Sequence, residues 1–448
     1  MNASPGRRAH AVVVGGSIGG MLMARVLSES YDRVTVVERD RFPEHPSTRR
    51  GTPQDRQVHA LLARGRMVLE ELFPGLTEEL VTAGAPLADM QSDMHWYQDG
   101  MLMKPVPSGL RGLGVSRPLL EHAVRSRVQD TAGVAFSEGC VVRGLTASRD
   151  GSRVTGVRLS ADGAAADSEL AADLVVDMSG RGSRSPAWLE DLGHGRPAEE
   201  TVRVRTTYVA RIYQRESHHL GGRSLTACSA FPGTPRSAIA IAQEGGRLAL
   251  SLGGWLGVTP PTDEAGALAY AESLAAPDFA EVIRTGKPLT EPALMRFPSS
   301  VRKRYEDLPS LPGGYLVAGD ALCSFNPFYG QGMTVAALQA VLLKNLLDDD
   351  RTDPGPAFLR AASRVLDTPW TVAVAGDLRY PEVDGVRTAG MRQFADYLTR
   401  FRKAAQDDAH LGTLLLRVTN MIDDPAVLTA PDAAERVEAA LAARHSLL

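Results

Sequence analysis

The first forty residues contain two apolar runs separated by a glycine-rich turn. Ala11–Val14 and Arg33–Glu38 are rich in β-branched residues, and continuous apolar runs of this kind are typical of strands buried on both faces. The turn Gly15–Gly20 and a helix-like stretch, Met21–Glu29, lie between them. The order strand, glycine turn, helix, strand predicts a βαβ unit and therefore a parallel sheet.

The next part of the chain mixes helical periods with short strands joined at Asp-Gly turns. Apolar periodicity and turn residues predict each element. We expect helices at Met67–Phe73, Thr77–Val81 and Ser116–Val128, a hairpin at His95–Met103 with its turn at Asp99-Gly100, a hairpin of Val141–Ala147 and Val154–Leu159 around Asp150-Gly151, and a buried strand at Leu174–Met178.

The pattern then changes to that of a second sheet. Thr201–Tyr213 alternates between apolar and basic positions, which predicts one half-exposed antiparallel strand. A further hairpin is expected to join Ser237–Ala242 to Arg247–Leu252. We interpret this region as a separate substrate domain. In the alternating strand, the predicted faces are Val202, Val204, Tyr208 and Ile212 on one side and Arg203, Arg205 and Arg211 on the other.

The last third begins with a short buried strand, Tyr315–Ala318, and a loop that runs to Gly332. Met333–Leu347 has the pattern of a helix, and the rest of the chain is rich in alanine, leucine and arginine. We therefore expect a mostly helical C-terminal region.

Composition narrows the class of protein. The 448 residues carry a formal net charge of -4, which argues against a nucleic-acid-binding protein. Three widely spaced cysteines predict neither disulfides nor a metal site. No apolar run reaches the ~18–20 residues of a membrane span, and the first residues lack the features of a signal peptide. A cytoplasmic protein without stable membrane insertion is expected.

The glycine turn has the form of a dinucleotide site. Gly15, Ser17 and Gly20 occupy the three positions of G-x-G-x-x-G, with serine in the middle. Small residues let the backbone approach a pyrophosphate at a helix N-terminus. Glu38 ends the second strand and could accept hydrogen bonds from ribose hydroxyls, which disfavours a 2′-phosphate and leaves NAD or FAD. The alternative is a plain tight turn and a solvated glutamate.

A second segment, Tyr315–Met333, favours FAD over NAD. It reads YLVAGDALCSFNPFYGQGM. Asp320 would lie at the carboxyl edge of the sheet, where a ribityl hydroxyl could bond to it. Gly330 and Gly332 precede a helix whose free N–H groups would face the ligand and stabilise negative charge on a reduced flavin. An NAD enzyme has no need of this second strand, loop and helix.

These motifs resemble the class A flavoprotein monooxygenases, the para-hydroxybenzoate hydroxylase-like group, over roughly residues 10–350. The resemblance implies that Arg49 contacts the FAD pyrophosphate and that Arg117, in SRPLL, touches FAD. The usual Asp-Gly is replaced by Ser179-Gly180, which puts direct coupling to NAD(P)H in question. The forms DMSGRGS, RRGTPQ, FNPFYGQGM and DLRYPEV (Asp377–Val383) look more like the polyether-type flavin epoxidases of actinobacteria.

The expected fold class is α/β: a Rossmann-like FAD-binding domain with an interleaved antiparallel β-sheet substrate domain and a helical C-terminal region. The expected divisions are 1–84, 116–195 and 299–347 for the FAD-binding domain, 85–115 for a substrate-domain hairpin, 196–298 for the substrate-binding sheet and 348–448 for the helical region. The candidate cofactor-binding residues are Gly15, Ser17, Ile18, Gly20, Glu38, Arg39, Arg49, Arg117, Val142, Asp320, Pro327, Gly330, Gly332 and Met333.

The resemblance implies a reaction as well as a fold. Family members use reduced FAD and molecular oxygen to form a flavin C4a-hydroperoxide, with NAD(P)H as reductant, either directly or through a partner reductase. We expect epoxidation of an alkene in a hydrophobic natural-product intermediate, a polyketide or terpenoid, as in antibiotic biosynthesis. Aromatic hydroxylation of a phenol and oxygen-independent flavin reduction of prenyl chains remain alternatives. A halogenase is disfavoured, because the chain has no W-x-W-x-I-P motif and no obvious lysine to carry hypohalous acid.

The substrate side has weaker signals. We find no clear acid–base pair and assign no catalytic residue; epoxidation requires none. His59 could face the flavin, although a role on a helix surface or in capping the core is the simpler interpretation. Ordinary packing is the alternative for the candidates on the hairpin, Trp96, Tyr97, Met101 and Met103. A solvated strand face is the simpler interpretation of Arg203, Arg205 and Arg211. The candidate pocket residues are Trp96, Tyr97, Met101, Met103, Tyr208 and Phe328.

Overall fold

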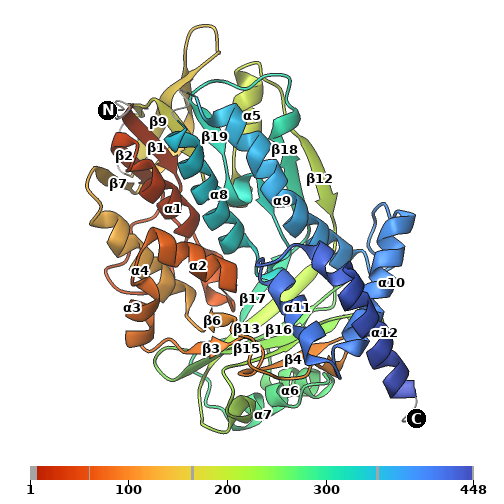
Figure 1. The fold of residues 1–448 in the computed structure, drawn as a ribbon. Coiled ribbons are helices and arrows are strands. Elements are labelled where there is room, and N and C mark those ends of the chain that lie inside the picture. Colours follow the sequence, from red (N-terminus) through yellow and green to blue (C-terminus); the bar gives the residue numbers. More distant parts are fainter. Residues whose placement is uncertain (1–7, 60, 163–165, 350–352, 446–448) are drawn as a thin grey trace, which may run out of the picture.

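The computed structural model describes residues 8–59, 61–162, 166–349 and 353–445. A five-stranded parallel sheet, in the order β19-β11-β1-β2-β7, forms its upper half (Figure 1). The predicted βαβ unit is therefore confirmed, because β1 pairs in parallel with β2. The strands of this sheet are β1 (Arg8–Val14), β2 (Tyr31–Glu38), β7 (Val134–Glu138), β11 (Leu174–Asp177) and β19 (Tyr315–Val317).

Helices cover this sheet and explain why its strands are apolar throughout. Figure 1 shows α1, α8 and α9 in front of the parallel sheet, with α2, α3 and α4 beside them. Because α1 packs between β1, β2, α4 and α8, eight of its ten residues are buried. The bounds are α1 (Ile18–Leu27), α2 (Ala63–Leu72), α3 (Leu76–Thr82), α4 (Arg117–Gln129), α5 (Ser185–Asp191), α8 (Gly332–Asp348) and α9 (Gly355–Asp377).

A seven-stranded sheet in the order β17-β13-β16-β15-β14-β4-β5 forms the lower half. It was expected to be antiparallel, but β14 pairs in parallel with β4, because β4 arrives from the other domain and not through a hairpin. The strands are β4 (Met94–Gln98), β5 (Met101–Leu102), β13 (Thr206–Gln214), β14 (Leu225–Cys228), β15 (Arg236–Gln243), β16 (Arg247–Gly254) and β17 (Ala293–Phe297).

Three smaller sheets complete the β-structure of the described residues. Their orders are β10-β9-β8, β12-β18-β20 and β3-β6. The strands are β3 (Leu87–Asp89), β6 (Arg111–Leu113), β8 (Cys140–Ala147), β9 (Val154–Ala161), β10 (Ser168–Ala171), β12 (Ala198–Val202), β18 (Ser300–Arg304) and β20 (Cys323–Ser324).

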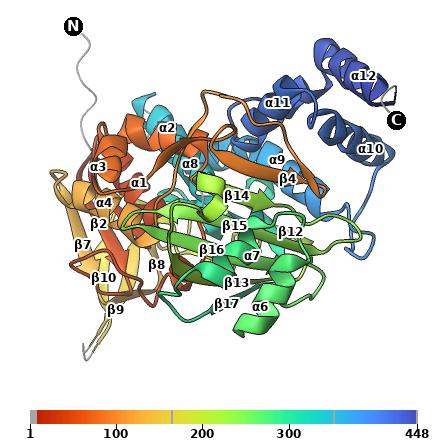
Figure 2. The ribbon, with the colours of Figure 1, turned by 90° about the horizontal axis from the view of Figure 1, so that it is seen from below.

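The two faces of the seven-stranded sheet have different partners. Helices α6 (Glu264–Glu272) and α7 (Asp278–Thr285) cover one face, and their apolar residues form one core with Leu248 and Leu250 of β16. Figure 2 shows these two helices against the sheet, with α10, α11 and α12 beyond its β4 edge. The other face is turned toward the interior of the molecule.

The C-terminal helices form a small core of their own. They are α10 (Ala389–Ala404), α11 (Ala409–Thr419) and α12 (Pro431–His445). Phe401 of α10 and Leu411 of α11 are fully buried within this core, and Met103 from the β5 side packs into it. The expected helical C-terminal region is therefore present, and it is attached to the seven-stranded sheet.

The strand expected over 201–213 is in fact two strands of different sheets. Arg205 has φ 51°, a left-handed conformation that ends one extended segment before the next begins. β12 pairs with β18, whereas β13 pairs with β16 and β17. Residues 206–210 are all buried, because α6 and α7 cover one face of this sheet and the other face is turned toward the interior. The predicted half-exposed alternation is therefore wrong there. Arg203 and Arg205 are exposed, in agreement with the interpretation that they lie on a solvated face.

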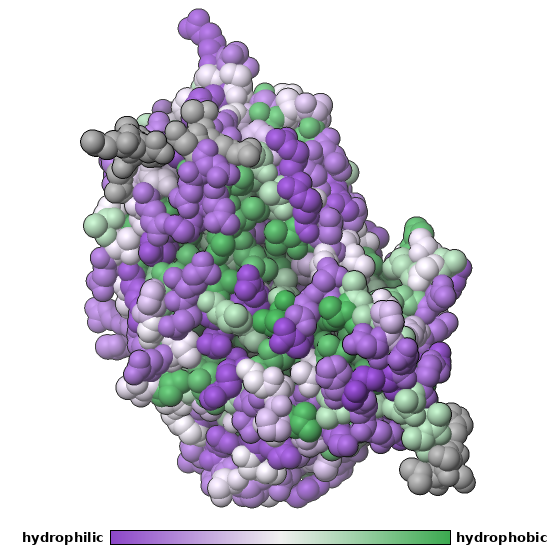
Figure 3. Space-filling model, viewed as in Figure 1, coloured by the Kyte–Doolittle hydropathy of each residue, from purple (hydrophilic) through white to green (hydrophobic). Residues whose placement is uncertain are grey.

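On the face shown in Figure 3, apolar side chains gather over α8 in the middle of the molecule. The partly buried apolar residues on this helix are Met333, Leu338, Val341, Leu342 and Leu346. Across the described ranges, no helix combines the length and the apolar character needed to cross a membrane.

Candidate functional site

One large cavity runs between the two sheets. Its volume is about 1430 Å³, above the ~300–1,000 Å³ of ordinary small-molecule pockets. It begins at the carboxyl ends of the parallel strands, where ligands of open α/β sheets bind, and reaches the inner faces of α10 and α11. The structure brings all fourteen candidate cofactor residues to its wall: Gly15, Ser17, Ile18, Gly20, Glu38, Arg39, Arg49, Arg117, Val142, Asp320, Pro327, Gly330, Gly332 and Met333.

The turn between β1 and α1 requires glycine at two positions. Gly15 has φ 106°, a conformation that side-chain-bearing residues rarely adopt. A Cβ on Gly20 would lie 1.8 Å from the carbonyl oxygen of Gly15, so helix and turn pack backbone against backbone. Ser17 is the N-cap of α1, and the first N–H groups of the helix face the cavity end. This arrangement can hold a pyrophosphate.

Glu38 lies at the end of β2, with only 5% of its surface exposed. One carboxylate oxygen accepts a hydrogen bond from the backbone N–H of Gly16, at 2.8 Å, and the other from the backbone N–H of Asp40, at 3.0 Å. The guanidinium of Arg49 is 3.3 Å away. The side chain is thus fixed in position on the cavity wall, where ribose hydroxyls could donate to it.

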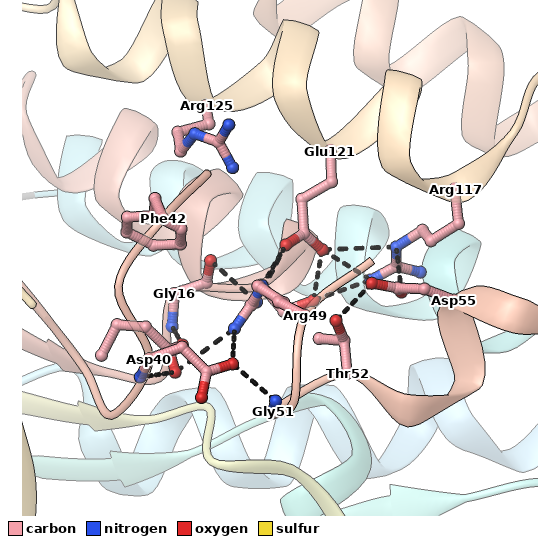
Figure 4. Close-up of polar contacts among 12 residues, drawn as sticks. Gly16, Asp40, Phe42, Arg49, Gly51, Thr52, Asp55, Arg117, Glu121 and Arg125 are labelled. Carbon is pink, nitrogen blue, oxygen red and sulfur yellow. Dashed lines mark hydrogen bonds and ion pairs between the residues drawn. The ribbon is translucent and has the colours of Figure 1, made fainter. Parts of the chain in front are cut away.

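Arg49 and Arg117 are held together by a carboxylate that the sequence analysis missed (Figure 4). Glu121, on α4, accepts hydrogen bonds from Arg49 at 2.8 Å and from the hydroxyl of Ser17 at 2.9 Å, and lies 3.4 Å from Arg117. Arg117 in turn donates to the Ser17 hydroxyl at 2.7 Å. Glu121 is one turn after Arg117 on the same helix, a spacing that would have suggested the pair.

The positively charged neighbours of Glu121 fix the sign of its contribution to stability. The two arginine guanidinium groups and the Ser17 hydroxyl outweigh burial and lower the pKa of Glu121. Its stabilising contribution is therefore present above the pKa it has in the unfolded chain, ~4.3, and is lost as the pH falls through its lower folded value. At neutral pH the carboxylate keeps both guanidinium groups on the cavity wall.

We expect Glu121→Gln to lower the free energy of unfolding by about 2–4 kcal/mol at pH 7, because it leaves two buried cations with less compensation. Chemical denaturation measures this. Glu190→Gln is the matched control, since its pair with Arg196 is exposed and should contribute at most ~1 kcal/mol. Equal effects of the two substitutions would contradict the role given to Glu121.

The segment Tyr315–Met333 contributes residues to the same cavity wall as the Gly15–Gly20 turn. Asp320 follows β19 and is open to the cavity, and its partial removal from solvent raises the pKa of its carboxyl. Gly319 has φ 59° and Gly330 has φ 64°, so both turns depend on glycine. Gly332 begins α8, whose N-terminus points to the cavity wall.

The DMSGRGS segment holds its aspartate away from the cavity. Asp177 is fully buried and accepts hydrogen bonds from the backbone N–H of Ser179, at 2.8 Å, and from the hydroxyls of Ser183 and Ser185. It therefore fixes the loop after β11. Ser179 lines the cavity, whereas Asp177 does not.

Three of the six candidate pocket residues, Trp96, Tyr208 and Phe328, line the cavity. The prediction was wrong for Tyr97. Successive side chains of a strand alternate between its faces: on β4, Met94, Trp96 and Gln98 line the cavity, whereas Tyr97 packs toward the core under α6 and α7.

The prediction was also wrong for Met101 and Met103. Both pack into the core of the C-terminal helices, and neither lines the cavity. Met103 is 3% exposed, and the sulfur of Met101 accepts a hydrogen bond from the side chain of Gln406, at 2.7 Å. Their hairpin meets a helical layer that lies about three hundred residues away in sequence, a contact that local pattern does not reveal.

His59 does line the cavity. Its Nδ1–H donates to the carbonyl oxygen of Gln57 at 3.0 Å, which leaves Nε2 as an acceptor. Burial, reinforced by the charge of Arg117, lowers the pKa of His59 to about 4. The imidazole is therefore neutral at pH 7 and adds no positive charge to the cofactor end of the cavity.

A buried carboxyl, which the sequence analysis did not assign, lies behind the cavity wall. Asp377, at the end of α9, accepts hydrogen bonds from the hydroxyl of Tyr329, at 3.0 Å, and from the side-chain amide of Asn326, at 3.1 Å. Asn326 in turn accepts from the hydroxyl of Tyr208 at 2.6 Å. Tyr208, Asn326 and Tyr329 line the cavity, and Asp377 does not.

The environment of Asp377 makes it titrate near neutrality. The residue has no exposed surface, and its second oxygen, Oδ2, finds no hydrogen-bond partner among the described residues. Burial outweighs its hydrogen bonds and raises the pKa of Asp377 to about 7. A carboxyl with this pKa can take up and release a proton at physiological pH. Its only sequence signal was the DLRYPEV stretch, in which it is the first residue.

Comparison with solved structures identifies the fold. The flavin-dependent brominase Bmp2 superposes with a TM-score of 0.67 at 14% identity, covering 98% of this chain and 100% of that chain. PqsL, a probable FAD-dependent monooxygenase from Pseudomonas aeruginosa, gives 0.60 at 18% identity, covering 83% and 97%. The flavin-dependent halogenase CmlS gives 0.62 at 15% identity, covering 93% and 77%. The chain therefore has the α/β fold of these flavoenzymes, with a helical C-terminal region.

Sequence comparison gives a relative over nearly the whole length. No protein-family model matches the chain. Protein Rv3254 of Mycobacterium tuberculosis (strain ATCC 25618 / H37Rv) is 33% identical over 428 residues, which cover 92% of this chain and 90% of that protein. An identity of this level over this length means shared ancestry and a shared fold, and the chain belongs to the family of Protein Rv3254.

Proposed function

We propose that the protein is a FAD-dependent monooxygenase that adds one atom of dioxygen to an apolar small molecule. The observation that carries this proposal is the continuity of the cavity. A wall built for a dinucleotide and a chamber lined by apolar side chains form one space of about 1430 Å³. A cofactor bound along the first part would present its reactive end to a substrate in the second.

The residues of the first part fit FAD. The backbone of the Gly15–Gly20 turn and the guanidinium groups of Arg49 and Arg117 would hold the pyrophosphate, and Glu38 would accept from the adenosine ribose. Asp320 would accept from a ribityl hydroxyl. The N-terminus of α8, at Gly332, would place its positive end beside the flavin ring. All of these groups lie on the wall of the same cavity.

When bound, FAD would supply the electrons and the site at which dioxygen is activated. The protein's part is to orient the substrate and to exclude water. Aromatic side chains do the latter: Trp255 packs edge-on against Phe328 with ring centroids 4.8 Å apart, and Phe328 packs on Tyr329 at 5.4 Å. These rings lie between the glycine loop before α8 and the seven-stranded sheet.

Two oxygenation reactions fit this space. Epoxidation of an alkene in a polyketide or terpenoid needs no proton acceptor, and it is supported by the resemblance of DMSGRGS, FNPFYGQGM and DLRYPEV to the polyether-type epoxidases. Hydroxylation of a phenol needs a group that takes the phenolic proton. The hydrogen-bonded pair of Tyr329 and Asp377 is such a group, and this observation favours hydroxylation as a second candidate.

The proton route in the second candidate has two steps that occur together. The Tyr329 hydroxyl donates its proton to ionised Asp377 across 3.0 Å and accepts the proton of the substrate hydroxyl. The substrate is left as a phenolate, whose ring carbon is electron-rich. Asp377 becomes a neutral acid, which its buried position favours.

Halogenation is not proposed, although two of the structural neighbours are a brominase and a halogenase. The described residues that line the cavity include no lysine, so no amine is placed to carry hypohalous acid. For the reductant, we propose NAD(P)H, acting directly or through a separate flavin reductase; Ser179 in place of the family's aspartate favours the second route.

The first test is the visible absorption spectrum of the purified protein. We expect bands near ~370 and ~450 nm and release of FAD on denaturation. NAD(P)H and oxygen consumption with alkenes and phenols, followed by product structure, separates epoxidation from hydroxylation. Turnover of prenyl substrates without oxygen would instead support a flavin reductase. A colourless protein that does not take up added FAD would overturn the proposal.

A further inference from the structure

A pair of arginines and one carboxylate lie where the cavity meets the C-terminal helices. Arg379 follows α9 and Arg402 is on α10, and both line the cavity. Asp99, at the tip of the β4–β5 hairpin, lies 2.9 Å from the guanidinium of Arg379. Its distance to Nε of Arg402 is 3.7 Å, too long for a hydrogen bond.

Arg402 is nearly buried and shares its ion-pair partner, Asp99, with Arg379. It is 9% exposed, and its side chain donates no hydrogen bond to any described residue. Its terminal nitrogen Nη1 is also shielded from solvent. Leaving a buried donor of a charged group unpaired is strongly unfavourable. Burial and the neighbouring Arg379 accordingly lower the pKa of Arg402 to about 10.

The local charge count leaves one positive charge unmatched. Two guanidinium groups, of Arg379 and Arg402, face the single carboxylate of Asp99. Asp377 is bonded to Tyr329 and titrates near neutrality, so it compensates at most in part. Asp424 also lines the cavity, next to Leu428, but it is exposed, so solvent screens its charge. The net charge of this end of the cavity is therefore close to +1.

The surroundings of these arginines are apolar. Side chains from the C-terminal helices line this part of the cavity: Phe394, Leu398, Leu415, Leu416 and Leu428. In such surroundings an ion pair is screened less than at a surface. A ligand that fits has an apolar body and one negative charge at its end.

We propose that Arg402 binds the carboxylate of an amphipathic substrate whose apolar body occupies the chamber beneath α10 and α11. A planar carboxylate matches the guanidinium fork, and its single charge matches the local excess of +1, whereas a phosphate monoester would bring an uncompensated second charge. That this ligand is then oxygenated rests on the proposed function, but the binding of the anion does not.

The experiment uses the purified full chain and three probes of one shape: 2-naphthoate, its methyl ester and 2-naphthyl phosphate. Isothermal titration calorimetry measures their dissociation constants. We expect naphthoate to bind roughly 10- to 100-fold more tightly than the ester, as one charge-assisted hydrogen bond predicts, and more tightly than the phosphate. Tighter binding of the phosphate would overturn the assignment of a carboxylate.

Arg402→Met removes the charge and keeps the length of the side chain. We expect it to abolish the preference for acid over ester, with Arg402→Lys retaining part of it. Arg400→Met is the matched control, because Arg400 is on the same helix but exposed and paired with Glu438; it should bind naphthoate like the parent protein. An unchanged preference in Arg402→Met would overturn the proposal.

Two further outcomes are decisive. If naphthoate, octanoate and dodecanoate all fail to bind the folded protein, the anion site does not exist. The flavin content of every sample, read from its absorption spectrum, reports separately on the proposed function. A protein without flavin that still prefers the acid would leave the anion site standing while removing the monooxygenase.

Discussion

Replacing Asp377 by asparagine is expected to lower kcat/KM for a phenolic substrate by about 10²–10⁴-fold, the usual contribution of a positioned base. The parent enzyme should gain activity with rising pH, with an apparent pKa near the value of about 7 given to Asp377, because only the ionised carboxyl can take the proton through Tyr329. The variant should lose that pH dependence. Steady-state kinetics over pH 5–9 measures both effects.

The same substitution separates the two candidate reactions. For an alkene substrate, no proton has to leave before oxygen transfer, so we expect Asp377→Asn to be nearly silent. Tyr329→Phe should reproduce the asparagine variant with phenols, since it breaks the link between cavity and carboxyl. Asp384→Asn serves as control, because Asp384 is exposed and lies seven positions further along. Equal pH profiles for the parent and Asp377→Asn with a phenol would remove Asp377 from the reaction.

The raised pKa of Asp377 also predicts how the stability of the fold changes with pH. Its folded pKa is raised, so the neutral acid stabilises the fold fully below the unfolded pKa of ~4, and that contribution is lost as the pH rises through about 7. Asparagine is neutral throughout. We therefore expect the free energy of unfolding of the variant to rise relative to that of the parent between pH 4 and pH 7, by up to about 4 kcal/mol. Its melting temperature should rise relative to the parent over the same pH range. A constant difference would show that the carboxyl is solvated.

The second large effect is expected at Gly20. Gly20→Ala would place a Cβ 1.8 Å from the carbonyl oxygen of Gly15. Gly15 cannot easily move away, because its own φ of 106° already depends on glycine. We expect a loss of about 2–4 kcal/mol in unfolding free energy and loss of copurifying FAD, since the turn that faces the pyrophosphate has to shift.

Gly19→Ala is the matched control for this prediction. The atom nearest to its new Cβ is the end of the flexible Met178 side chain, at 2.5 Å, and alanine is the better helix former. Its stability should stay within ~1 kcal/mol of the parent. Thermal melts and the ratio of flavin to protein absorbance report both quantities. A Gly20→Ala protein as stable and as yellow as Gly19→Ala would show that the close approach is not required.

Much of the fold followed from local pattern. The β1–α1–β2 unit, the hairpins at Asp99-Gly100 and Asp150-Gly151, and the helix after Gly332 are present where periodicity and turn residues put them. Such elements depend on residues a few positions apart, so the sequence carries them directly. The break at Arg205 did not follow, because which sheet each half joins depends on partners far along the chain.

Local motifs indicated the residues of the candidate cofactor wall but not those of the substrate chamber. The sequence motifs picked out glycines, an acid and arginines at fixed spacings, and all fourteen candidates line one cavity. The chamber has no such spacing. Tyr97, Met101 and Met103 turn away from the cavity because strand alternation and the C-terminal core decide their direction.

The sequence by itself determined a βαβ unit with a dinucleotide turn and a second strand, loop and helix that could meet a flavin. Only the tertiary structure joined Glu121 to the two arginines, Asp377 to Tyr329, and Arg402 to the wall of the cavity. Each is a polar residue on or at the end of a helix, ordinary in its local sequence. Its chemistry arises from burial and from partners on other elements, and neither exists until the chain has folded.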